Sequence, residues 1–120
     1  MERADRLIVE LVEAAWPEAP EGFARAMFGG VGLKTAKGAS FGLIADGVLF
    51  LKRDEPKTDD SIPWFAYERG DGKVIRMCYA EVAADDLESA SRLAPLLGAA
   101  RRVAEANYKP STKRRRGKLE

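Results

Sequence analysis

Two apolar runs separated by Asp46-Gly47 constrain the fold of this chain more than any other feature of its sequence. The runs are Phe41-Gly42-Leu43-Ile44 and Val48-Leu49-Phe50-Leu51. A two-residue hairpin turn of type I′ needs positive φ at both central residues, and Asp-Gly is one of the few dipeptides that accept this conformation. The pattern therefore predicts an antiparallel β-hairpin centred on this turn.

The same strand pattern extends to both sides of this hairpin. Short apolar runs broken by glycines continue from Ala24 to Lys52 and predict an antiparallel meander. Residues 53–61 contain no apolar residue except Pro56, which is typical of an exposed connection. A second hairpin is expected from Trp64–Tyr67 and Val74–Tyr79, with Gly70-Asp71-Gly72 as its turn.

Helical periodicity appears at the two ends of the chain. Apolar residues spaced along one face predict a helix from about Arg3 to Ala15, which must end before Pro17. Beyond Val82 the helical period returns. Because proline fits best in a first turn, we expect Pro95 near the start of a C-terminal helix that begins at residues 91–94, after a separate short turn at residues 85–88.

Residue counts exclude several classes of chemistry. The 120 residues include no histidine, and Cys78 is the only cysteine, so a His-dependent triad, a Cys/His dyad, a structural zinc site and an intrachain disulfide are all excluded. We expect no catalytic residues, no metal and no cofactor, and the chain is predicted not to be an enzyme. The alternative of an enzyme would require carboxylate, lysine or tyrosine chemistry. No apolar run approaches the roughly 20 residues that span a bilayer, so we expect a cytoplasmic protein without a membrane partner.

Charge is unevenly distributed along the chain. Residues 109–120 contain six Lys or Arg and one Glu, a net of +5, whereas residues 1–108 carry 14 basic and 18 acidic groups, a net of −4. The segment 109–120 is expected to be a disordered basic tail, either a solubilising extension or a nucleic-acid clamp acting by charge alone. The tail residues that would contact phosphates are Lys113, Arg114, Arg115, Arg116 and Lys118.

Several of these segments, taken in order, resemble the N-terminal domain of the TfoX family of bacterial competence regulators. The resemblance is carried by residues 27–33, which read Met-Phe-Gly-Gly-Val-Gly-Leu, and by residues 41–52, which end in Asp-Gly-Val-Leu-Phe-Leu-Lys. Residues 64–67, residues 77–82 and the C-terminal helical segment follow in the family's order. Residues 1–108 are therefore interpreted as one TfoX N-terminal-like domain.

The resemblance implies an α+β fold: a two-layer domain in which an antiparallel β-sheet meander packs against N- and C-terminal helices. It also implies a non-catalytic regulatory module that binds another protein, related to competence. Full-length regulators of this type usually add a second helical domain, so a DNA-directed role that depends on that domain is not carried over. The alternative is a nucleic-acid-associated protein that uses the basic tail.

Candidate site residues follow from these hypotheses. We expect Met27, Phe28 and Trp64 to contribute to a protein-interaction surface, because a large apolar group left on an exposed face often marks a partner site. The motif glycines are not followed by the Lys and Ser/Thr of a phosphate-binding loop. We therefore assign structural roles in turns or close packing to the remaining motif residues, which are Gly29, Gly30, Gly32, Asp46 and Gly47.

Overall fold

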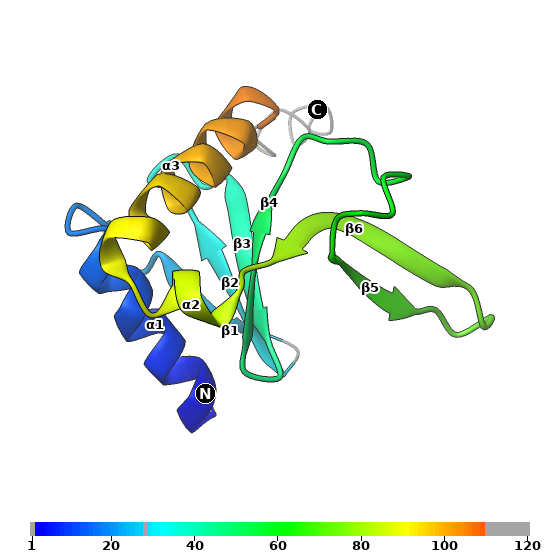
Figure 1. The fold of residues 1–120 in the computed structure, drawn as a ribbon, viewed down its shortest axis with the longest axis horizontal. Coiled ribbons are helices and arrows are strands. Elements are labelled where there is room, and N and C mark those ends of the chain that lie inside the picture. The colour runs from blue at the N-terminus through cyan, green and yellow to red at the C-terminus, as the bar shows by residue number, and fades with distance from the viewer. Residues whose placement is uncertain (1, 28, 110–120) are drawn as a thin grey trace, which may run out of the picture.

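One antiparallel sheet and the helices on one of its faces make up the structure (Figure 1). The computed structural model describes residues 2–27 and 29–109, and the six strands of that part are β1 (Ala24–Met27), β2 (Gly30–Lys34), β3 (Ser40–Ala45), β4 (Val48–Lys52), β5 (Trp64–Glu68) and β6 (Val74–Glu81). The helices are α1 (Arg3–Ala15), the short α2 (Ala84–Leu87) and α3 (Ala90–Ala106). The predicted two-layer α+β fold is confirmed.

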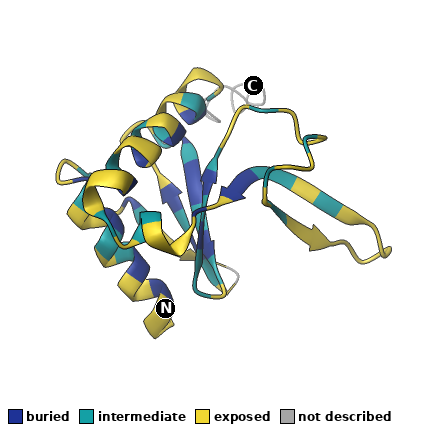
Figure 2. Ribbon diagram, in the orientation of Figure 1, coloured by how far each residue is buried: buried dark blue, intermediate teal, exposed yellow. Residues whose placement is uncertain are grey.

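The core lies between this sheet and the two long helices (Figure 2). Apolar residues at helical spacing give α1 and α3 one buried face each, and buried residues of β2, β3 and β4 meet that layer. Burial alternates along β2 and β4, whereas β3 buries the adjacent Phe41 and Gly42 where its pairing with β2 is irregular. Trp16 follows α1 and packs edge to face on Phe41, with ring centroids 5.5 Å apart. The largest fully buried side chains are Phe41, Leu33, Ile44, Leu49, Leu93, Leu97, Val12 and Val31.

The sheet order is β1-β2-β3-β4-β6-β5. The first four strands form the predicted meander, but the second hairpin joins it through β6 instead of β5. Only the end of β6 pairs with β4, over the three residue pairs from Phe50↔Glu81 to Lys52↔Tyr79. The rest of the β5–β6 hairpin therefore projects away from the helices, and its outer half is largely exposed (Figures 1 and 2).

Both predicted turns are present, and the first has the expected backbone. Asp46 has φ 51° and Gly47 has φ 73°, which are the two positive values that a type I′ turn requires. In the second turn Gly72 has φ 88°, and the amide of Arg69 donates to the carbonyl of Lys73 at 2.7 Å. The register of the first hairpin, with Ala45↔Val48 next to the turn, follows from this geometry.

The C-terminal helix begins earlier than predicted, at Ala90 instead of residues 91–94. The Ser89 hydroxyl accepts from the amide of Arg92 at 3.3 Å and caps the helix directly before Ala90. Pro95 therefore lies inside the helix, and because proline has no backbone N–H, the helix makes one hydrogen bond fewer. The cap and the burial of Leu93 and Leu97 outweigh that loss.

Candidate protein-interaction surface

The second face of the sheet points away from the helices, and its middle is apolar. Gly32, Leu43 and Phe50 lie side by side across β2, β3 and β4 on this open face. Successive residues of a strand alternate between the two faces, so these three cannot contribute to the core beneath the helices. The rings of Phe50 and Phe65 pack edge to face with centroids 5.0 Å apart, and this contact holds the projecting hairpin against the open face.

A groove of about 760 Å³ runs between the β5–β6 hairpin and strands β2 and β3. Two of its lining side chains are large and exposed: Met27 by 51% and Tyr67 by 44%. Methionine adapts its shape to a partner, and an apolar concave surface of this kind marks binding sites. The lining residues are Met27, Gly29, Gly30, Val31, Leu43, Ile44, Ala45, Asp46, Phe65, Tyr67 and Met77.

Only part of the predicted interaction surface is found in this groove. Met27 lines it, whereas Phe28 lies outside the described residues. Trp64 is half-buried, and its indole N–H donates to the carbonyl of Asp59 at 2.9 Å. Sequence reasoning missed Tyr67 and Met77 as surface candidates, since strand aromatics and methionines usually belong to a core.

The motif glycines shape the wall of the groove. A side chain at Gly30 would collide with the carbonyl oxygen of Ile44 on the neighbouring strand. A Cβ at Gly32 would lie 2.7 Å from the sulfur of Met27, so glycine there lets Met27 lie across the open face. Gly29 has φ 80° and turns the chain between β1 and β2. The structural roles predicted for these glycines fit this geometry.

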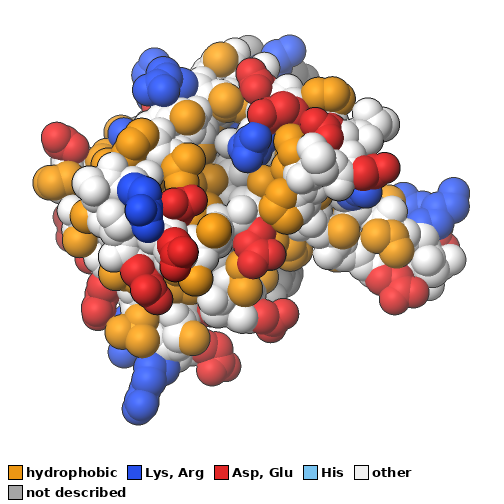
Figure 3. Space-filling model, in the orientation of Figure 1, with side chains coloured by type: hydrophobic (Ala, Val, Ile, Leu, Met, Phe, Trp, Pro, Cys, Tyr) orange, Lys and Arg blue, Asp and Glu red, His pale blue; other side chains and the backbone are white. Residues whose placement is uncertain are grey.

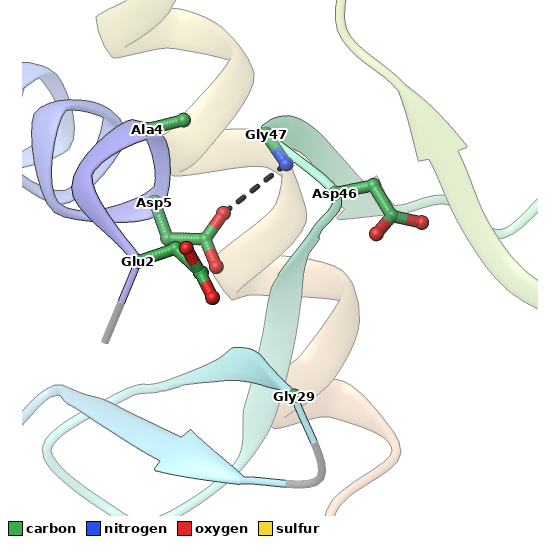
Figure 4. Close-up of a pocket in the computed structure, with 6 residues that line it drawn as sticks. All are labelled: Glu2, Ala4, Asp5, Gly29, Asp46 and Gly47. Carbon is green, nitrogen blue, oxygen red and sulfur yellow. Dashed lines mark hydrogen bonds between the residues drawn. The ribbon is translucent and has the colours of Figure 1, made fainter.

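A second cavity, of about 340 Å³, lies where α1 meets the Asp46-Gly47 turn (Figure 4). Asp5 is only 2% exposed, and its carboxylate accepts from the amide of Gly47 at 3.1 Å. Glu2 also lines this cavity, while the Asp46 carboxylate points away from Asp5 (Figure 4). Asp5 therefore ties helix to hairpin. In the sequence, Asp5 is recognisable only as an acidic residue in the first turn of a predicted helix.

The acidic residues of the β4–β5 connection have partners of their own. Arg53 forms an ion pair with Glu55 at 2.7 Å, and its hydrogen bonds hold the pKa of that carboxyl below the ordinary value. The Ser61 hydroxyl donates to Asp59 and lowers the pKa of Asp59 as well. Across residues 2–27 and 29–109, no group of three His, Cys, Asp or Glu side chains is placed to hold a metal ion.

The residues proposed for nucleic-acid contact all lie in 110–120, outside the described residues. They are Lys113, Arg114, Arg115, Arg116 and Lys118. Within the described ranges there is no helix with the length and apolar character needed to cross a membrane.

Comparison with protein-family models and with curated protein sequences finds no match for this chain. The resemblance to the TfoX N-terminal domain stays a prediction carried by the motif residues themselves.

Proposed function

We propose that this chain is a non-catalytic regulatory module that acts in the cytoplasm by binding another protein through the groove on its open face. The observation that carries the proposal is the groove itself: an apolar, concave surface of about 760 Å³ with Met27 and Tyr67 exposed along it. Isolated apolar side chains are common on any surface, but a contiguous apolar concavity favours a partner.

The resemblance to TfoX-type competence regulators supports the regulatory part of this proposal. Met27, Gly29, Gly30 and Asp46 belong to the motifs that carry the resemblance, and they also line the groove. The motif residues and the candidate binding surface thus coincide. We propose that the partner belongs to the regulation of competence or transcription.

A matched pair of substitutions on the projecting hairpin tests the proposal. Tyr67→Glu places a charge in the groove, whereas Val74→Glu places one at a residue that is 68% exposed and does not line the groove. Affinity capture from the native host should yield a stoichiometric protein with the parent and with Val74→Glu. The same protein should be lost with Tyr67→Glu.

Two results would contradict the proposal. The first is repeated capture of nothing stoichiometric by the parent chain. The second is a captured protein that Tyr67→Glu and Val74→Glu retain equally, which would place the binding surface elsewhere. Circular dichroism of both variants checks that each one folds.

A further inference from the structure

The free edge of β5 offers backbone groups to a partner. The amide of Arg69 donates inward to Lys73, and Tyr67 pairs with Ile75 in the same register. Because hydrogen-bonding directions alternate along an antiparallel strand, the N–H and C=O groups of Ala66 and Glu68 face outward. In the described part of the chain β5 is the last strand of the sheet, and neither Ala66 nor Glu68 makes a backbone hydrogen bond to a residue beyond the sheet.

This edge carries only part of the usual protection against pairing with another strand. Edge strands are commonly guarded by charged side chains, proline or bulges, and Trp64–Glu68 contains no lysine, arginine or proline. Its one charged residue is Glu68, and its pairing with β6 is irregular between Trp64 and Ala66. The opposite edge, β1, carries Arg25. Ala66, Tyr67 and Glu68 are all exposed, so an added strand could reach their backbone.

A cavity of about 400 Å³ adjoins this edge and continues the groove. It lies between the start of β5 and the tip of the β3–β4 hairpin, in the notch beside the projecting hairpin (Figure 3). A strand added to β5 would direct alternate side chains toward this cavity. The lining residues are Ala45, Asp46, Val48, Phe50, Trp64, Phe65, Ala66 and Glu81.

The charged residues that line the groove and the adjoining cavity have one sign. Asp46 and Glu81 are the charged residues among the described side chains that line the groove or the adjoining cavity, and no lysine or arginine lines either one. Glu68 adds a third carboxylate on the edge strand itself. An occupant with basic side chains would meet complementary charge, whereas an acidic one would be repelled.

We propose that the partner segment is an extended strand that pairs with the free edge of β5 and carries apolar and basic residues on the face turned to the groove. Its backbone bonds to Ala66 and Glu68, and its groove-facing side chains, at every second position, are apolar beside Met27 and Tyr67 and basic beside Asp46 and Glu81. This inference rests on the proposed function and adds the conformation and chemistry of the partner. Strand addition of this kind draws affinity from main-chain hydrogen bonds and specificity from alternate side chains.

The first experiment selects a phage-displayed library of random short peptides against the whole chain. The selected peptides should carry apolar residues and Lys or Arg on the same face of the strand, at every second position. One of them is then synthesised, and its affinity is measured by fluorescence anisotropy for the parent and for the double variant Asp46→Asn/Glu81→Gln. The double variant should bind it more weakly, and raising the salt concentration should narrow the difference.

The second experiment tests the backbone pairing with the same peptide. Ala66→Pro removes an outward N–H but no hydrogen bond to β6, and it should weaken binding by about tenfold. Ala26→Pro is the matched control on the other edge, because the Phe23–Lys34 hydrogen bond and the Ala26↔Val31 register turn the Ala26 amide outward as well. That variant should bind like the parent.

Four outcomes would overturn the inference. These are a library that yields no binder, selected peptides with acidic residues or helical spacing, equal affinity for Ala66→Pro and the parent, and a self-associating chain whose dimer Ala66→Pro dissociates. If Tyr67→Glu still abolishes capture of a partner in any of these cases, the proposed function stands and only the extended basic strand is wrong. If Tyr67→Glu has no effect on capture, the proposed function fails as well.

Discussion

Replacing Gly47 by valine tests the hairpin from which the fold was predicted. Gly47 has φ 73°, a left-handed conformation that costs an L-residue about 1–2 kcal/mol. A Cβ there would also lie 3.3 Å from the Cβ of Ala4 in α1, tighter than ordinary contact. The two effects together predict that Gly47→Val lowers the free energy of unfolding by about 1–3 kcal/mol.

Gly72 separates the two contributions to this loss. It has φ 88°, but a Cβ at Gly72 would have nothing within 4 Å. Gly72→Val therefore carries the backbone strain without the crowding, and its effect should be the smaller one. Asp46→Asn should be nearly neutral, because asparagine tolerates the φ of 51° found at that position.

Urea denaturation of the four proteins provides the measurement. If Gly47→Val matched the parent in both midpoint and slope, the strain argument would fail. Equal losses for Gly47→Val and Gly72→Val would instead show that the contact with Ala4 contributes nothing.

Three further predictions concern ionisable groups. Asp5→Ala should lower the free energy of unfolding by about 1–3 kcal/mol, because the half-buried amide of Gly47 loses its acceptor, and Asp5→Asn should cost less since it keeps one; thermal unfolding measures both. Hydrogen bonding from Arg69 holds the pKa of Asp71 below its ordinary 3.8. This hydrogen bond should stabilise the fold fully above pH 3.8, and the stabilisation should be lost as the pH falls through the lower pKa of Asp71 in the folded state. Asp71→Asn removes this carboxylate, so the stability of the variant, followed by circular dichroism in an acid titration, should depend less on pH in this range. Under the nucleic-acid hypothesis, the intact chain should bind duplex DNA with an affinity that falls steeply with salt, and deletion of residues 109–120 should abolish binding in a gel-shift assay. Binding that survives the deletion would refute the role of the tail.

Local sequence determined most of the secondary structure. The apolar period of residues 3–15 predicted α1 with the bounds it has, and Asp46-Gly47 predicted a turn whose two φ angles are both positive. These features depend on steric limits and periodicity within a few residues, so they can be recognised without the rest of the chain. The predicted start of α3 was too late because it rested on Pro95 alone, whereas the cap at Ser89 starts the helix at Ala90.

Only the tertiary structure decided which surface is left for a partner. Alternation along a strand gives two faces, but it does not say which of them the helices cover or that β6, instead of β5, pairs with β4. Met27, Leu43, Tyr67 and Met77 come together from four strands, and the partner of Asp5 lies 42 residues away along the chain. Such contacts depend on how the long connections fold back, and periodicity within one strand or helix carries no information about that.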